Sequence, residues 1–326
     1  MKRLTQEVIA FLKKAKREYS YEELAKHFNV TTSKMKTTVG MISKNHLNLF
    51  IHDEKVAVSR LIQPNPPSYF KEKHLDGEWI KFGFTTDNHL GSKYERLDVL
   101  NQAYKHFSEL GIRTVFNAGN MIDGEARFNK FDIHTHGMQG QVDYFIRMFP
   151  RYDGITTHFI TGDDHEGWYT QREGINIGKF IETQAKNSGR HDLIYLGHME
   201  HDVIIKKSHG NCVIRIQHPG GGSAYAISYT SQKIVESFSS GEKPHVLLIG
   251  HYHKAAYNYI RGIHVVQGGC TMDQSPFMRK KRLDAHVGYW IIEMKISIGG
   301  IVTNFRSEYV SFYDSGFYKK GWDYQF

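Results

Sequence analysis

One stretch decides the fold of this chain: Val246-Leu247-Leu248-Ile249-Gly250-His251-Tyr252-His253. Its four apolar residues predict a fully buried strand, and Gly250 lets the backbone turn sharply where that strand ends. The histidines that follow, His251 and His253, can each turn a ring nitrogen into the same crevice, and imidazole is a preferred ligand of Zn, Mn and Fe. A lone His-x-His is common on protein surfaces, so a metal site requires matching ligands elsewhere in the chain.

Such ligands follow four apolar runs upstream, each of which predicts a strand. The clusters are Asp87-Asn88-His89, Gly119-Asn120-Met121-Ile122-Asp123-Gly124, Gly162-Asp163-Asp164-His165-Glu166 and His218-Pro219-Gly220. Ligands of open α/β sheets bind outside the carboxyl ends of the strands, where neighbouring strand ends meet. We therefore expect these clusters to form one active site at one edge of a sheet.

Strands and helices alternate from Trp79 onward, and the second half of the chain is richer in strands. We predict strands at 80–85, 114–116, 157–160, 203–206, 213–217, 245–249, 255–260, 264–267 and 289–296, and helices at 95–110, 142–148, 174–187 and 224–238. This order favours an α/β domain in which two stacked mixed sheets lie between helical layers.

The first sixty residues form a smaller and more basic segment. They hold 12 Lys/Arg against 6 Asp/Glu, which leaves 30 against 28 for the other 266 residues. Apolar spacings predict three helices and a hairpin at 48–58, a pattern that resembles a winged helix-turn-helix domain over 1–62. Its third helix, with Lys34, Lys36 and Lys44, would then read a nucleic-acid groove. A protein-binding module of the same fold is the alternative.

The segment Gln63-Pro64-Asn65-Pro66-Pro67-Ser68 marks the domain boundary. It contains three of the seven prolines of the chain, and proline can continue neither a helix nor a central strand. We predict a linker over 63–76 and a second domain over 77–326.

Cysteine content and hydropathy indicate the compartment. Cys212 and Cys270 are too few for a disulfide framework, which fits a reducing environment and leaves His, Asp and Asn to build any metal site. No run of eighteen apolar residues occurs, and the first seven residues lack the apolar segment of a signal peptide. We therefore expect a cytoplasmic protein without membrane contact.

Taken in order, the five clusters resemble the calcineurin-like metallophosphoesterase superfamily. Its pattern is Asp-x-His, Gly-Asp, Gly-Asn-His-Asp/Glu, a lone His and Gly-His-x-His, and the match covers the chain from Trp79 to the final strands. The resemblance implies an αββα sandwich that holds two metal ions and hydrolyses phosphoesters.

The resemblance also implies a role for each matching residue. One metal ion would be held by Asp87, His89 and His253, and the other by Asp164, His218 and His251, with Asn120 at the bridging position. His165 would protonate the leaving oxygen, and Asp123 either orients a ligand histidine or caps a helix. In this chemistry two cations roughly 3.5–4 Å apart acidify a bridging water, whose hydroxide attacks in line. Imidazole and carboxylate ligands favour Mn, Fe or Zn over Ca or Mg, and Mn²⁺ is the leading expectation.

Two positions depart from the family pattern. Asn120 stands where the family has a bridging Asp, and Asp164 stands where it has Asn, after Asp163 instead of Gly. Either Asp and Asn have exchanged naturally, which preserves the ligand charge, or an Asp has been replaced to trap an inactive enzyme. A shift of the loop by one residue would make Asp163 the ligand.

We predict phosphodiester hydrolysis on nucleic acid, most plausibly by a DNA nuclease. The prediction combines the two-metal pattern with the basic head and with the run Arg279-Lys280-Lys281-Arg282, which could clamp a nucleic-acid backbone. The alternatives are a phosphatase or phosphodiesterase for small phosphoesters or phosphoproteins, and a catalytically silent DNA-binding protein. A homodimer or a protein partner stays open.

Overall fold

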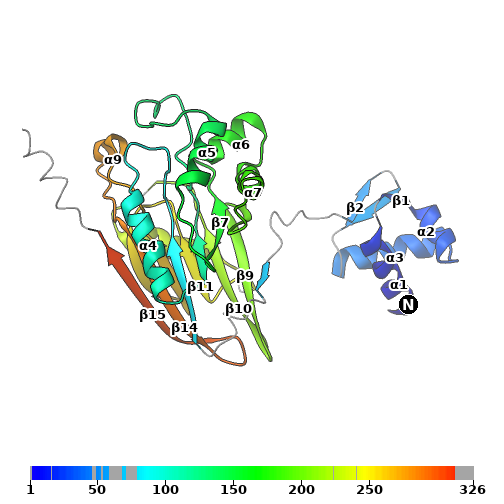
Figure 1. Cartoon of the computed structure of the whole chain (residues 1–326). Helices are drawn as coiled ribbons and strands as arrows, with labels where there is room; N and C mark the ends of the chain where they lie inside the picture. Colours follow the sequence, from blue (N-terminus) through cyan, green and yellow to red (C-terminus); the bar gives the residue numbers. More distant parts are fainter. Residues whose placement is uncertain are drawn as a thin grey trace, which may run out of the picture. The chain divides into compact units, whose positions relative to one another are not determined.

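The chain divides into two compact units, residues 1–63 and 64–326 (Figure 1). The computed structural model describes residues 2–15, 17–45, 49–52, 54–58, 68–70, 79–222, 224–239 and 241–312. Among these residues, no helix combines the length and the apolar character that crossing a bilayer requires.

The first unit contains the helices and the hairpin that its sequence predicts. Its elements are α1 (Lys2–Lys14), β1 (Tyr19–Ser20), α2 (Tyr21–His27), α3 (Thr32–Asn45), β2 (Leu49–His52) and β3 (Lys55–Val58). The strands pair antiparallel in the order β1-β3-β2, so the short β1, which the sequence analysis does not predict, completes a small sheet.

The periodic apolar positions of the first unit form its core. Val8, Leu24, Met35 and Val39 are fully buried, and Val56 of β3 packs with them. Helix α2 begins at the predicted capping box, since the Ser20 hydroxyl accepts from the Glu23 amide at 3.1 Å while the Ser20 amide donates to Glu23 Oε2 at 2.7 Å.

The described strands of the second unit form two six-stranded mixed sheets. The first sheet has the order β15-β14-β5-β6-β7-β8, in which β5 to β8 run parallel. The second has the order β12-β13-β11-β10-β9-β4, in which β10, β11 and β13 run parallel. The first-sheet strands are β5 (Trp79–Thr85), β6 (Thr114–Asn117), β7 (Thr156–Thr161), β8 (Leu193–His198), β14 (Gly288–Ile296) and β15 (Val302–Ser311). The second-sheet strands are β4 (Ser68–Phe70), β9 (Glu200–Lys207), β10 (Gly210–Gln217), β11 (Val246–Ile249), β12 (Ala255–Ile260) and β13 (Ile263–Gly268).

The described part of the second unit contains six helices. They are α4 (Leu97–Glu109), α5 (Met138–Met148), α6 (Gly167–Glu173), α7 (Ile177–Asn187), α8 (Ile227–Ser237) and α9 (Pro276–Lys281). Helices α4, α5 and α7 bury side chains against the first sheet, and α8 packs on β11 and β13. A separate apolar cluster, which includes Phe82, Phe116 and Ile214, fills the space between the sheets. The predicted αββα sandwich is therefore confirmed.

Several local predictions differ from the structure, and strand β8 and helices α6 and α9 are absent from the predicted elements. The predicted linker over 63–76 includes β4, which pairs with β9, and the rest of that segment lies outside the described residues. The helix predicted from Gly174 begins later, because Gly174 adopts φ +66° and ends α6, while Asn176 caps α7. Strand β15 was not predicted, because it is an edge strand whose polar residues obscure the alternation.

Replacing Phe116 with Ala should destabilise the second unit by about 3–5 kcal/mol, because the fully buried ring leaves a cavity between the sheets. Denaturant unfolding of the full chain measures this loss. The matched control is Ile298→Ala at a position that is 68% exposed, where a change within about 0.5 kcal/mol is expected. A loss below about 1 kcal/mol for Phe116→Ala would contradict the assigned core.

Candidate metal centre

The candidate ligands lie on sharp turns at the carboxyl ends of strands. Six described non-glycine residues of this edge have φ between 48° and 78°, in the left-handed region: Asp87, His89, Asn120, His165, His251 and His253. A non-glycine residue pays about 1 kcal/mol or more for this conformation, so such residues persist where the surrounding structure demands them. The backbone is thus strained at the positions that the sequence analysis selects.

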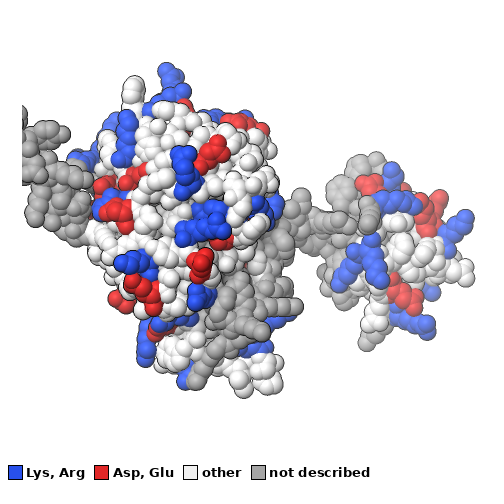
Figure 2. All heavy atoms as spheres, in the orientation of Figure 1, with Lys and Arg blue, Asp and Glu red and all other residues white. Residues whose placement is uncertain are grey.

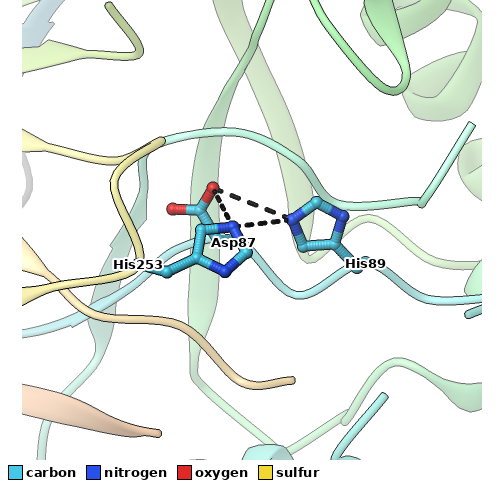
Figure 3. Close-up of side chains that lie close together, drawn as sticks. All are labelled: Asp87, His89 and His253. Carbon is cyan, nitrogen blue, oxygen red and sulfur yellow. Dashed lines mark hydrogen bonds and ion pairs between the residues drawn. The ribbon is translucent and has the colours of Figure 1, made fainter. Parts of the chain in front are cut away.

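The first group of ligand atoms comes from both sheets. Asp87 and His89 follow β5 of the first sheet, and His253 follows β11 of the second. Their side chains point toward one another (Figure 3). His253 Nε2 lies 3.4 Å from Asp87 Oδ1 and 3.2 Å from His89 Nε2. Such spacing lets one cation contact all three residues.

The second group also joins the two sheets. Asp164 follows β7, His218 follows β10 and His251 follows β11. His218 Nε2 lies 3.1 Å from Asp164 Oδ1, and His251 Nδ1 lies 3.2 Å from Asp164 Oδ2. Asp164, and not Asp163, thus belongs to the group, which answers the question of loop register among the described residues.

Three of the imidazoles have one nitrogen already occupied by a fixed acceptor. His89 Nδ1 donates to Asp123 Oδ1 at 2.9 Å, His218 Nδ1 donates to the Ala118 carbonyl at 2.6 Å, and His251 Nε2 donates to the Gly221 carbonyl at 2.7 Å. In each ring the other nitrogen faces its ligand group, which is the tautomer that binds a metal.

Asn120 lies beside both groups. Its Nδ2 is 3.4 Å from Asp87 Oδ1, and its neighbour Gly119 lies directly against the His218 ring. Asn120 Oδ1 is buried and has no hydrogen-bond partner among the described residues. An orphaned buried oxygen is costly, and a cation at this position would satisfy it.

The side chain of His165 lies next to the first group. Its Nδ1 donates to the Asp123 carbonyl at 2.8 Å, and its ring stacks on Trp168 with centroids 4.7 Å apart. Burial lowers the pKa of His165, but hydrogen bonding to Asp123 and the charge of Asp164 outweigh burial and raise the pKa to about 9. With Nδ1 engaged by the Asp123 carbonyl, Nε2 is the ring nitrogen that can pass a proton to a substrate.

Three glycines make room for the buried His218 ring. A Cβ atom on Gly119 would lie 2.8 Å from His218 Nδ1, and one on Gly162 would lie 2.6 Å from its Cδ2. A Cβ on Gly250 would meet Thr86 Oγ1 at 2.4 Å and His218 Nδ1 at 3.0 Å. The glycines that precede the ligands thus permit close approach as well as turning.

The sequence analysis assigned no role to two buried supporting residues. Glu166 Oε1 accepts from the backbone amides of Asn120 at 2.8 Å and Gly162 at 3.0 Å, which ties two ligand loops together. Thr86 Oγ1 donates to Asp87 Oδ2 at 2.7 Å and leaves Oδ1 for the ligand group. The fourth position of the Gly-Asn-His-Asp/Glu pattern pointed to Glu166, whereas no sequence signal marked Thr86.

The predicted nucleic-acid contacts belong to α3 of the first unit and to α9 of the second unit, and none of them is a member of a ligand group. Lys34 and Lys36 are exposed on α3, where Lys36 pairs with Glu54 at 2.6 Å. Lys44 also falls in α3, but its side chain lies outside the described part of the structure. The basic run from Arg279 is exposed on α9, and Arg282 ends that helix with φ +58°.

The donor set fits two divalent cations. Each group offers two imidazole nitrogens and one carboxylate, and the buried oxygen of Asn120, whose amide contacts Asp87, is a further neutral donor. Burial raises the pKa of Asp87, but the neighbouring His253 and His218 outweigh it and hold the pKa below its usual range. Nitrogen with oxygen donors suits Mn, Fe or Zn, and the geometry does not select among them.

No protein-family model and no curated protein matches this chain. Solved structures with a similar fold include an archaeal phosphodiesterase, with 12% identity, a TM-score of 0.37, and 71% of this chain and 100% of that chain covered. A second is Vps29 of Entamoeba histolytica in complex with zinc, with 16% identity, a TM-score of 0.33, and 71% of this chain and 99% of that chain covered. A third is a predicted phosphoesterase of Streptococcus pneumoniae, with 13% identity, a TM-score of 0.32, and 72% of this chain and 98% of that chain covered. Likeness of this degree concerns the fold alone, and the chemistry of this chain depends on the residues of its own site.

Replacing Gly250 with Ala should weaken Mn²⁺ binding about 10- to 100-fold, because the new methyl group displaces Thr86 or the His218 ring. Titration calorimetry with Mn²⁺ measures the change. Gly222→Ala is the matched control, since a Cβ there meets nothing within 4 Å. Equal affinities of the two variants would show that close packing around His218 does not matter for binding.

Replacing Asn120 with Asp should lower stability in EDTA and increase the stabilisation by Mn²⁺. The new carboxylate would lie about as close to Asp87 as the present 3.4 Å amide, so two buried like charges repel until a cation neutralises them. Each 1 kcal/mol lost lowers the melting temperature by about 2–4 °C.

Thermal melts with EDTA and with Mn²⁺ measure both effects. Asp163→Asn is the control, because Asp163 belongs to neither ligand group. An unchanged response of Asn120→Asp to Mn²⁺ would place residue 120 outside the metal centre.

Proposed function

We propose, from the αββα fold and the ligand constellation of calcineurin-like metallophosphoesterases, that this chain is a two-metal-dependent phosphodiesterase acting on nucleic acid, as a DNA nuclease. The observation that carries the proposal is the pair of adjacent three-residue ligand groups at one edge of the sandwich, with His165 beside them. Two adjacent cation sites and a proton donor are the parts that phosphodiester hydrolysis requires.

Each group of residues has its own proposed role in hydrolysis. Asp87, His89 and His253 would hold one cation, while Asp164, His218 and His251 would hold the other. Two bound divalent cations would lower the pKa of a water molecule and neutralise the charge of the phosphate. His165, held by the Asp123 carbonyl, would donate its Nε2 proton to the leaving oxygen.

The basic first unit supports nucleic acid as the substrate. Its strand and helix order, with the exposed Lys34 on α3, suits a winged helix that contacts a phosphate backbone. On the face of the second unit seen in Figure 2, cationic and anionic side chains are interspersed. The first unit, together with the α9 run from Arg279, is therefore the better candidate for backbone binding.

A phosphatase or phosphodiesterase for small phosphoesters is the second candidate, because phosphatases and nucleases can share the same metal ligands. The alternatives differ in their response to salt. A nuclease that neutralises several phosphates loses affinity steeply as salt rises, whereas a small-molecule enzyme does not.

The test is Mn²⁺-dependent cleavage of end-labelled single- and double-stranded DNA by this chain and by Asn120→Asp. We expect cleavage that is about 10-fold or more faster in the variant, since a bridging carboxylate neutralises two cations better than an amide. His165→Asn is the control for background nuclease, because it removes the proposed proton donor.

The outcomes separate the candidate functions. Cleavage by Asn120→Asp alone would identify the present sequence as a trapped form, and cleavage by both would favour a natural Asp/Asn exchange. If neither cuts DNA while both hydrolyse a small aryl phosphate, the small-phosphoester function takes its place. If neither form hydrolyses any phosphoester, the remaining candidate is a catalytically silent DNA-binding protein.

A further inference from the structure

Two aromatic side chains lie beside His165 without serving the core. Phe128, in the segment between β6 and α5, meets the Trp168 ring edge-on with centroids 5.3 Å apart, and Trp168 stacks on His165 at 4.7 Å. Phe128 is 67% exposed although it is apolar. A large exposed aromatic ring next to a reactive group is a common mark of a binding surface.

The segment that carries Phe128 is anchored to the metal centre. Asn129 is only 6% exposed, and its Nδ2 donates to Asp123 Oδ2 at 3.1 Å, while Asp123 Oδ1 accepts from the ligand His89. Asn129 Oδ1 also accepts from the Ala126 amide at 2.8 Å. The aromatic pair Phe128 and Trp168 is therefore held at a defined position relative to the ligands.

Charge around the pair is compatible with a phosphate-linked ring. Arg127, next to Phe128 in the chain, is exposed, and the nearby Glu125 is engaged by Lys130 at 3.5 Å and by the Gly137 amide at 2.7 Å. The pair thus offers an apolar, π-rich surface, and the Glu125 carboxylate in the same segment is already paired. Nucleobases stack on such surfaces largely irrespective of sequence.

We propose that Phe128 and Trp168 form a stacking surface for the nucleobase of the nucleoside unit whose sugar oxygen is the leaving group and meets His165. The proposal rests on the function proposed above and specifies its substrate: a nucleotide unit carrying a base next to the scissile bond. It gives the enzyme tolerance for base identity, because stacking uses the ring face and not the hydrogen-bonding edge.

The test compares ligands that differ only in the base. Thymidine 5′-phosphate and 2-deoxyribose 5-phosphate are titrated calorimetrically into the full chain, without added metal, for the unsubstituted chain and for Phe128→Ala. We expect the thymidine compound to bind more tightly than the base-free compound. Phe128→Ala should weaken binding of the thymidine compound about 5- to 100-fold and change binding of the base-free compound by less than about 2-fold. Phe128→Tyr should retain the affinity.

Phe131→Ala is the matched control, because Phe131 lies in the same segment and is 88% exposed but has no described ring contact with Trp168. It should leave both affinities unchanged. Equal binding of the two ligands, no binding of either, or an equal loss of both in Phe128→Ala would overturn the stacking surface.

Hydrolysis of a thymidine dinucleotide and of its analogue lacking the base on the leaving side separates this proposal from the function itself. With Mn²⁺, Phe128→Ala should raise KM about tenfold for the complete dinucleotide only. If Phe128→Ala leaves KM unchanged while hydrolysis proceeds, the stacking surface fails and the phosphodiesterase stands. If base-selective binding occurs and no form, including Asn120→Asp, hydrolyses either compound, the phosphodiesterase fails.

Discussion

The site depends on how closely the edges of the two sheets approach around His218. This residue comes from the second sheet, and its Nδ1 donates to the Ala118 carbonyl of the first sheet at 2.6 Å. A second link runs from the His251 amide to Asp87 Oδ2 at 2.9 Å. Gly119, Gly162 and Gly250 leave no side chain in the space that the His218 ring fills. Without this approach, each ligand group would lose the members that the other sheet contributes.

The edge of the sandwich that carries the candidate ligands also carries features that destabilise the fold. Left-handed backbone at the ligand positions, an orphaned Asn120 oxygen, and close pairs such as the His89 and His253 nitrogens all disfavour the bare fold. Cation binding relieves the last two, because lone pairs that repel one another or lack a partner become ligands. The apolar cluster between the sheets supplies the stability that holds this arrangement in place.

Asp123 links the surroundings of His165 to the candidate ligand His89 and to the segment that carries Phe128. Asp123 supports His89 through one carboxylate oxygen and Asn129 through the other, while its carbonyl holds His165. His89, His165 and the segment that carries Phe128 therefore share one buried residue, Asp123. A change in any of these parts is transmitted to the others through short, buried hydrogen bonds.

The sequence by itself determined the layers of the sandwich and singled out the candidate ligands. Apolar runs ending in glycine predicted β11 and its neighbours, and the ordered clusters identified Asp87 through His253, because strand period and ligand chemistry are both local properties. Tertiary structure alone decided between Asp163 and Asp164, recruited Glu166 and Thr86, joined β4 to the second sheet, and brought Phe128 to Trp168. These outcomes depend on contacts between residues far apart in the chain. Such contacts produce no periodic pattern in the sequence of either segment, so the sequence does not predict them.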